Sequence, residues 1–321
     1  MGAFRGSGAV NRGVFNMIAC EQQPLRARDG VSLGWWRVAH GVHQAAQPRH
    51  LLLTHGMFSD RRVCMSLARA WARQGHVAWI LEWRGHGNSE SVADAFDMET
   101  VAEQDIPAAL AALRTQVAPG QLCAAAHSGG GLALTMALLR QPELGELLQR
   151  MALFACQASG AAGTPWRFAR LALAAGAARA YGRIPARPLR LGVQDEPHAM
   201  MASWFRWNLR RRFVGRDGFD YAALQRDMEL PVMAVAGQQD RLVAPPEACR
   251  RFWQRFGGHA EGEFLLCGPS TGYAHAYGHA SIMHSPHAAR EVLPRVIAWL
   301  LEDEAGQAAA DVERATGQAA A

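Results

Sequence analysis

A serine between very small residues stands where an apolar run passes into a helical pattern. Ser128 has Ala126 two positions before it and Gly130 two positions after it, within the segment LCAAAHSGGG. This arrangement is close to G-x-S-x-G, the pattern of a sharp strand-to-helix turn that exposes a nucleophilic hydroxyl. Small residues are needed there because the turn is tight and the serine backbone is strained. The alternative is an ordinary glycine-rich turn in which the serine has no chemical role.

Two backbone N–H groups are predicted to stabilise an anion beside this hydroxyl. Gly129 opens the helix that follows Ser128, so its N–H and the helix dipole would face a developing oxyanion. The second donor is expected in His55-Gly56-Met57-Phe58, directly after an apolar run, and we assign it to Met57. Phe58 and His127 are neighbours of these groups in the chain, and we predict that both contact the substrate.

A carboxylate that could support the serine follows a later apolar run. The run Val232–Ala236 continues through Gly237-Gln238-Gln239 to Asp240. The other usual position for the acid, after the preceding strand, holds Gln157 instead. We therefore predict Asp240 as the acid, and its alternative role is a helix cap or an ion pair with Arg241.

An imidazole that could act as the general base comes last in the chain. His279 follows Gly278 and precedes the apolar helical pattern near the C-terminus, and His275 is the second choice. A metal site is an alternative use of these histidines together with His284 and His287. No Asp or Glu stands between them and H-E-x-x-H is absent, so we predict neither a metal nor another cofactor.

These residues require a scaffold that brings distant segments together. Short apolar runs alternate with helical patterns, which indicates an α/β fold with a mostly parallel sheet and helices on both faces. The predicted strands are Val31–Ala39, His50–Thr54, Val77–Trp83, Gln121–Ala126, Met151–Cys156, Pro231–Ala236 and Glu263–Cys267. The predicted helices are Arg61–Gln74, Val101–Gln116, Gly129–Arg140, Pro246–Phe256 and His287–Leu301.

The alternation breaks between residues 158 and 228, where we find no strand-like run. We predict a helical cap insertion over the carboxyl ends of the strands, because long insertions in such folds usually serve as lids. Further helix on the outer face is the alternative. Trp204 and Trp207 are predicted to bind an acyl or aryl group, and nearby arginines either attract an anionic leaving group or form a solvated face.

Further motifs resemble those of the α/β-hydrolase superfamily, in particular acid-lipase-like and esterase-like members. Residues 82–89 resemble its D-x-R-G-x-G-x-S loop, with Glu82 in place of the aspartate, and Arg84 and Ser89 are expected to tie that loop down. Residues 105–108 resemble a D-[IL]-P-A step. The resemblance covers roughly residues 25–301 and implies the α/β-hydrolase fold with Ser128, Asp240 and His279 as the catalytic triad. Related polyhydroxyalkanoate synthases use cysteine, so the serine favours hydrolysis.

The resemblance leaves three functions open. The first is hydrolysis of a carboxylic ester through an acyl-enzyme. The second is a thioesterase or acyltransferase that uses the same three residues. The third is a ligand-binding protein on the hydrolase scaffold, because a fold alone does not confer activity. All three imply a small-molecule partner, and the sequence does not set the oligomeric state.

Bulk composition limits these possibilities further. The chain has 321 residues and a formal charge of +5, and all 33 basic residues are arginine. This bias makes the charge a weak argument for a nucleic-acid partner, and we expect none. No apolar run reaches the 18 or so residues of a membrane span, so we expect no stable membrane insertion. Six cysteines without a Cys-x-x-Cys pair favour free thiols.

The absence of a signal-peptide pattern favours a cytoplasmic protein. We therefore predict a core formed by residues 25–157 and 229–302, with the cap at 158–228. Residues 1–24 and 303–321 are predicted to be flexible, and either Met1 or Met17 could be the start of translation.

Overall fold

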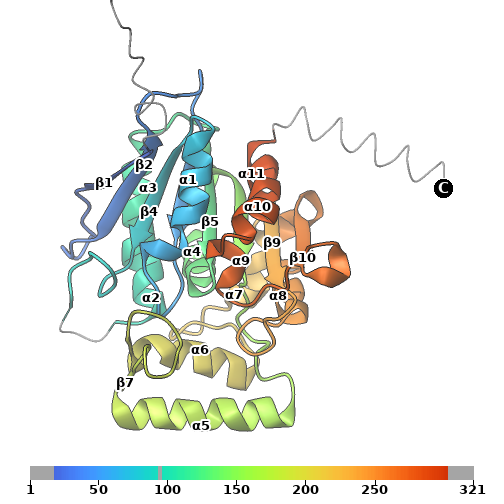
Figure 1. Cartoon of the computed structure of the whole chain (residues 1–321). Coiled ribbons are helices and arrows are strands. Elements are labelled where there is room, and N and C mark those ends of the chain that lie inside the picture. Colours follow the sequence, from blue (N-terminus) through green and yellow to red (C-terminus); the bar gives the residue numbers. More distant parts are fainter. Residues whose placement is uncertain (1–17, 93–95, 303–321) are drawn as a thin grey trace, which may run out of the picture.

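An eight-stranded sheet forms the centre of the computed structural model, which describes residues 18–92 and 96–302 (Figure 1). The strand order is β1-β2-β4-β3-β5-β6-β9-β10. β2 is antiparallel to both β1 and β4, and every other neighbouring pair is parallel. The strands are β1 Ile18–Gln23, β2 Gly34–His40, β3 His50–Thr54, β4 Val77–Glu82, β5 Leu122–His127, β6 Leu148–Phe154, β9 Val232–Gly237 and β10 Glu263–Cys267. The predicted α/β fold with a mostly parallel sheet is confirmed.

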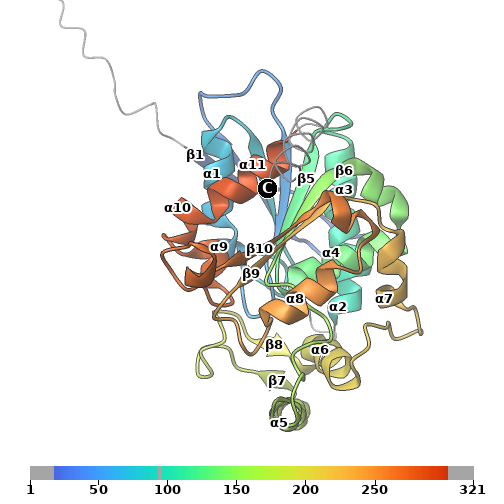
Figure 2. The same ribbon diagram turned by 90° about the vertical axis from the view of Figure 1, so that its right-hand side faces the viewer.

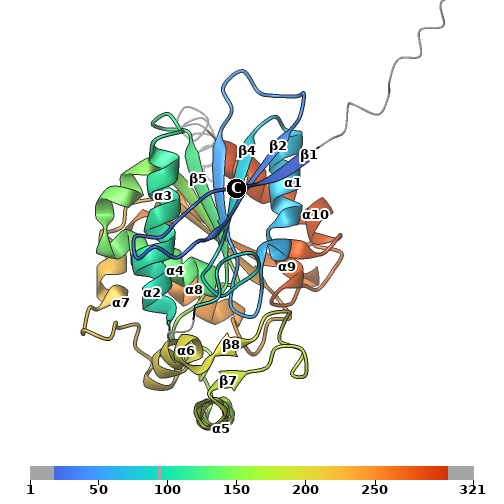
Figure 3. The ribbon, with the colours of Figure 1, turned by 90° about the vertical axis from the view of Figure 1, so that its left-hand side faces the viewer.

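Helices cover both faces of this sheet because successive strand residues point to opposite sides. Leu52 joins the core beneath one layer, whereas Leu51 and Leu53 join the core beneath the other. The first layer holds α2 Met98–Thr100, the π-helical turn η3 Val101–Asp105, α3 Ile106–Arg114 and α4 Gly129–Arg140. The second layer holds α1 Met65–Arg73, α9 Ser281–His284, α10 Ala288–Glu291 and α11 Leu293–Leu301 (Figures 2 and 3).

The remaining helical elements are short or lie at the edges. α8 Pro246–Trp253 packs against β9. The other turns are η2 Arg61–Val63, η4 Pro142–Leu147, η6 Gly257–Glu261 and η7 Pro269–Thr271. None of the described helices is long and apolar enough to cross a bilayer.

The N-terminal prediction is wrong for Ile18–Gln23, which form β1 and not a flexible leader. Each of these residues pairs with a residue of β2, from Ile18 with His40 to Gln23 with Trp35. β1 is an edge strand whose side chains are exposed or half-buried and none fully buried, so it lacks the apolar alternation by which sequence patterns reveal strands. Residues 1–17 and 303–321, including Met1 and Met17, lie outside the described residues.

The segment between β6 and β9, residues 158–228, contains both helices and a small sheet. It comprises α5 Pro165–Tyr181, β7 Arg183–Ile184, β8 Glu196–Pro197, α6 His198–Arg210, α7 Tyr221–Leu224 and η5 Gln225–Asp227. The expectation that it lacks strands is wrong, because β7 and β8 pair antiparallel. We call residues 158–228 the inserted segment. Its α5 and α6 lie beyond the carboxyl ends of the strands, whereas α7 runs beside α4 (Figures 1 and 2).

Candidate active site

Ser128 lies at the sharp turn between β5 and α4. Its backbone has φ 51° and ψ −120°, a strained combination for a residue with a side chain. The Ser128 N–H donates a 2.8 Å hydrogen bond to the carbonyl of Phe154, which fixes the turn to the neighbouring strand. The strained turn is therefore held by the parallel sheet, and Ser128 as a residue is only 8% exposed.

Three close approaches explain the glycines around this turn. A Cβ built on Gly130 would lie 2.3 Å from the carbonyl oxygen of His55, and one on Gly131 would lie 2.3 Å from the Sγ of Cys156. A Cβ on Gly56 would lie 2.8 Å from the Cβ of Ser128. These positions let the loop after β3 pack directly against the turn after β5.

The three residues predicted as a triad form one chain of hydrogen bonds. The Ser128 Oγ lies 2.9 Å from the Nε2 of His279. The Nδ1 of His279 lies 2.5 Å from Oδ2 of Asp240. The three side chains come from the ends of β5 and β9 and from the loop before α9, which are far apart in sequence. The geometry is that of a nucleophile, a base and an orienting acid.

The carboxylate of Asp240 is buried among groups that form hydrogen bonds with it. Burial raises its pKa, but hydrogen bonding to His279 and the N–H groups of Ala244 and Val243 outweighs burial and leaves a lowered pKa. Gln157 supports the same loop, since its Nε2 donates to the carbonyl of Val243 at 2.7 Å. The amide at the other usual acid position therefore braces the loop that carries the acid.

His275, the second choice for the base, lies elsewhere. Its Nδ1 is 3.2 Å from Glu291, and its ring stacks on His287 with centroids 3.4 Å apart. Across the described residues, no group of three His, Cys, Asp or Glu is arranged to hold a metal ion.

His127 is buried beside the nucleophile and contacts the backbone of the candidate base. Its Nε2–H donates a 2.9 Å hydrogen bond to the carbonyl of His279. Burial, followed by the nearby His279, lowers the pKa of His127 to about 3. The imidazole is thus neutral at physiological pH and holds the loop of His279, and its predicted contact with the substrate stays a prediction.

The two predicted oxyanion donors lie next to each other. A Cβ built on Gly129 would lie 3.2 Å from the Cγ of Met57, so the loops after β3 and β5 touch at these residues. Neither the N–H of Met57 nor that of Gly129 has an intramolecular acceptor within residues 18–92 and 96–302. Both donors are therefore available to a bound group.

The backbone of Phe58, the residue after Met57, is hydrogen-bonded to the inserted segment. It has a left-handed backbone, with φ 61°. Its N–H donates a 2.6 Å hydrogen bond to the carboxylate of Glu196, and its carbonyl accepts from the N–H groups of Val193 (2.8 Å) and Gln194 (3.2 Å). The inserted segment thus fixes the backbone directly after Met57.

Glu196 also meets a buried histidine, and sequence reasoning missed both residues. The Nε2 of His86 lies 2.9 Å from Glu196, and both side chains are almost fully buried. Burial lowers the pKa of His86, but the charge of Glu196 together with the hydrogen bonds to Glu196 and to the Arg84 carbonyl outweighs burial, and the net pKa is raised. One signal was present in the chain: between residues 158 and 216, Asp195 and Glu196 are the only acidic residues.

The two predicted substrate-binding tryptophans lie on α6 and are buried. Trp207 is 1% exposed, its Nε1–H donates to the carbonyl of Val214 at 2.8 Å, and its ring meets Phe213 edge-on. Trp204 packs edge-on against Phe205. Trp207 thus packs against Phe213 with its polar atom satisfied, and the predicted contact of both tryptophans with the substrate stays a prediction.

The loop that follows β4 is held as the sequence predicted. The guanidinium of Arg84 binds Asp105 and Asp29, with Nη2 2.7 Å from the Asp105 carboxylate. The Ser89 hydroxyl donates to the carbonyl of Glu82 at 2.7 Å. The side chain of Glu82, where the motif has aspartate, accepts from the Trp36 indole and the Asn88 N–H.

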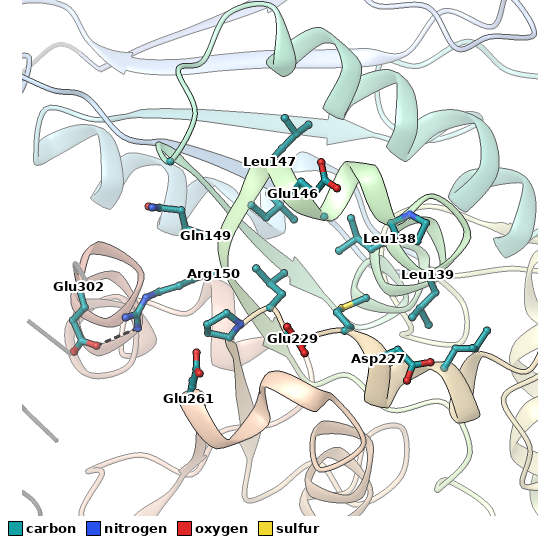
Figure 4. Close-up of a pocket in the computed structure, with 18 residues that line it drawn as sticks. Leu138, Leu139, Glu146, Leu147, Gln149, Arg150, Asp227, Glu229, Glu261 and Glu302 are labelled. Carbon is teal, nitrogen blue, oxygen red and sulfur yellow. Dashed lines mark hydrogen bonds and ion pairs between the residues drawn. The ribbon is translucent and has the colours of Figure 1, made fainter. Parts of the chain in front are cut away.

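A cavity of about 1080 Å³ lies at the other end of the sheet. Its wall includes the start of β6, the residues before β9, and several carboxylates, with Arg150 bound to Glu302 (Figure 4). The cavity thus lies away from Ser128, Asp240 and His279, which stand at the carboxyl ends of the strands.

Comparisons with known proteins support a hydrolase fold. Residues 45–203 match the family model described as serine aminopeptidase, S33. No curated protein matches the sequence significantly.

Solved structures supply three close fold matches. An esterase from Thermogutta terrifontis superposes with a TM-score of 0.58 at 16% identity, covering 87% of this chain and 98% of its own. The esterase EaEST from Exiguobacterium antarcticum gives 0.61 at 15% identity, covering 88% and 100%. DcsB, solved with a substrate analogue, gives 0.65 at 14% identity, covering 90% and 100%. With this fold and the strand-to-helix turn at Ser128, the chain belongs to the α/β-hydrolase superfamily.

Proposed function

We propose that this protein is a serine hydrolase that cleaves a carboxylic ester through an acyl-enzyme. The observation that supports the proposal most directly is the chain of hydrogen bonds from Ser128 through His279 to Asp240, at 2.9 Å and 2.5 Å. Its members are held at the ends of β5 and β9 and in the loop before α9, and precise catalysis requires such support from a rigid scaffold.

In the proposed reaction, Ser128 Oγ attacks the ester carbonyl while His279 Nε2 takes its proton. The carbonyl oxygen becomes an anion that the N–H groups of Met57 and Gly129 stabilise. His279 then donates the proton to the departing alkoxide, which leaves as the alcohol. Water repeats the sequence on the acyl-enzyme and releases the acid. Asp240 remains ionised throughout and stabilises the imidazolium.

The surroundings of the nucleophile favour an apolar acyl group. Met57 and Met98 both lie against Gly129, within 3.3 Å of a Cβ built there. Thioether side chains adapt to ligands of different shape, because they are unbranched and polarisable. We therefore propose that the acyl chain contacts the partly exposed Met57, which Met98 backs from the core, and that the inserted segment acts as the cap above it.

A fluorophosphonate probe tests the nucleophile without knowledge of the substrate. We expect mass spectrometry to find the adduct on Ser128 and Ser128→Ala to remain unlabelled and without esterase activity. A folded wild-type protein that neither labels nor hydrolyses esters would overturn the proposal and favour a ligand-binding protein.

A substrate panel then defines the reaction class. We expect p-nitrophenyl esters of graded chain length to be hydrolysed, with turnover in water above transfer to added alcohols. Faster turnover of acyl-coenzyme A than of the matched ester would identify a thioesterase, and a dominant transfer product would identify an acyltransferase.

The cysteines support a reducing location for this activity. All six are free, and five are buried. Structural disulfides are frequent in oxidising compartments and rare in the cytosol. We therefore propose that the protein works in the cytoplasm.

A further inference from the structure

The outermost helix of the inserted segment, α5, is barely buried. Only Ala178 of its 17 residues is buried, and the helix packs on α6 (Figure 1). Seen along its axis, α5 stands away from the body of the molecule as its most distant helix (Figure 2). At 1.5 Å per residue it is about 25 Å long. A long and exposed helix of this kind usually presents a polar outer face.

The outer face of α5 is apolar instead. Trp166, Arg170 and Leu173 fall on one side at helical spacing, turned away from the half-buried Leu171 and Ala175, and Tyr181 is exposed at the C-terminal end of the helix. Trp166 is 54% exposed, Leu173 76% and Tyr181 83%. Three large apolar or aromatic side chains thus point away from the fold, with no described element covering them.

The charged residues of the chain around this face are all basic. Residues 158–194 contain six arginines and no acidic residue. One of the six, Arg183, has a carboxylate nearby, with Asp195 at 3.8 Å. Arg170 lies over the ring of Trp166, 4.7 Å from its centroid. The face therefore combines exposed apolar groups with cationic groups that have no carboxylate partner among the described residues.

We propose that α5 docks this protein on an anionic lipid bilayer. Helices that lie in a membrane interface combine arginines with Trp and Leu, and bind by apolar burial together with attraction to acidic headgroups. A second copy of this chain fits less well, because a two-fold contact would place the arginines of both copies against each other. A nucleic acid would satisfy the arginines but leave Leu173 without an apolar contact.

Docking through α5 would turn the carboxyl edge of the sheet toward the lipid. The inserted segment lies beyond that edge, where Ser128 is located, and residues 193–196 hold Phe58 beside Met57. If the proposed hydrolysis is correct, the substrate class becomes an amphiphilic ester drawn from the bilayer. This last step rests on the proposed function, whereas bilayer binding does not.

Sedimentation with vesicles tests the proposal. We expect the full chain to bind phosphatidylglycerol vesicles at least about tenfold more tightly than phosphatidylcholine vesicles, and added salt to weaken the binding. The variant Trp166→Ala/Leu173→Ala/Tyr181→Ala should lose binding, and Arg170→Ser should weaken it about fivefold. Ser128→Ala should bind like the wild type, which separates this result from the outcome of the esterase assays.

A matched control is available at the opposite end of the sheet. Val42 and Arg73 are exposed near the amino ends of β3 and β4, so Val42→Ala/Arg73→Ser should bind vesicles normally. Circular dichroism must show that the α5 triple variant is folded. The proposal is wrong if the wild type does not bind anionic vesicles, or if the folded triple variant binds them with the affinity of the wild type. It is also wrong if ultracentrifugation finds a dimer that the triple variant abolishes.

Discussion

The carboxylate of Glu196 accepts a 2.6 Å hydrogen bond from the backbone N–H of Phe58. This bond joins β8 of the inserted segment to the loop that carries Met57. Because Phe58 has φ 61°, the loop is held in a conformation that a non-glycine residue rarely adopts. Glu196 thus positions the proposed oxyanion donor without touching the reacting atoms.

Removing this carboxylate should weaken turnover more than substrate binding. Glu196→Ala is expected to lower kcat for a short ester about 10- to 100-fold with little change in KM. That loss is smaller than the roughly 10²- to 10³-fold effect of deleting a donor outright. Glu196→Gln keeps an acceptor for Phe58 and should recover part of kcat.

The neighbouring carboxylate provides the control. Asp195 accepts a 2.8 Å bond from the N–H of Ala186, away from Phe58, so Asp195→Asn should retain normal kcat. If Glu196→Ala lowers the unfolding temperature but leaves kcat unchanged, the positioning role is excluded.

The acid of the triad can be tested by a change that preserves its shape. Asp240→Asn should lower kcat by about 10⁴-fold, because the amide favours the wrong tautomer of the imidazole. Steady-state kinetics and thermal unfolding would be measured together. A variant that keeps a tenth of the activity would show that another carboxylate supports His279.

The two candidate bases should behave differently. His279→Ala is expected to abolish esterase activity, since its Nε2 contacts the nucleophile. His275→Ala removes an imidazole that stacks on His287 and should leave kcat nearly unchanged. Equal losses in both variants would contradict the assignment of the base.

The close packing of Gly131 against Cys156 predicts that a second substitution restores stability. Gly131→Ala should destabilise the protein by about 1–3 kcal/mol, since its Cβ meets the Sγ of Cys156. Cys156→Ala removes that atom, so the double variant should recover about 1 kcal/mol or more in a urea-unfolding cycle. Gly130→Ala meets the His55 carbonyl instead, and Cys156→Ala should not rescue it. Strict additivity of Gly131→Ala and Cys156→Ala would refute the contact.

Stability should fall as the solution becomes acidic, in part because of His127. Its pKa is about 3 in the folded protein, below its ordinary value of 6.5, so only the unfolded chain takes up this proton as the pH falls between these values. The contribution to folding is thus present above pH 6.5 and declines toward pH 3. At pH 5.5 the loss is about 1.4 kcal/mol relative to pH 7.5.

His127→Gln keeps a donor for the His279 carbonyl but does not titrate. Between pH 7.5 and pH 5.5, the free energy of unfolding of this variant in urea should fall by about 1.4 kcal/mol less than that of the wild type. His55, whose pKa is also about 3, contributes to the pH dependence of both proteins. An unchanged pH dependence would show that His127 is not buried as a neutral imidazole.

The parts that the sequence alone determined are local. The small residues around Ser128 reveal a sharp turn, because backbone sterics depend only on immediate neighbours. The apolar runs identify β3 and β10 to the residue, since strands that bury side chains fully or in part need apolar residues there. The order of Ser128, Asp240 and His279 follows from the succession of strands and helices, because parallel strands end at one edge.

The tertiary structure alone decided what depends on a partner elsewhere in the chain. β1 exists because β2 supplies its hydrogen bonds, and its own polar residues gave no signal. The environment of Glu196 is formed by Phe58 and His86, which lie 138 and 110 residues away. Trp207 and Tyr181 are both aromatic residues of the inserted segment, yet one is buried and the other exposed. Burial depends on which faces pack against each other when the chain folds, and no local sequence pattern specifies that packing.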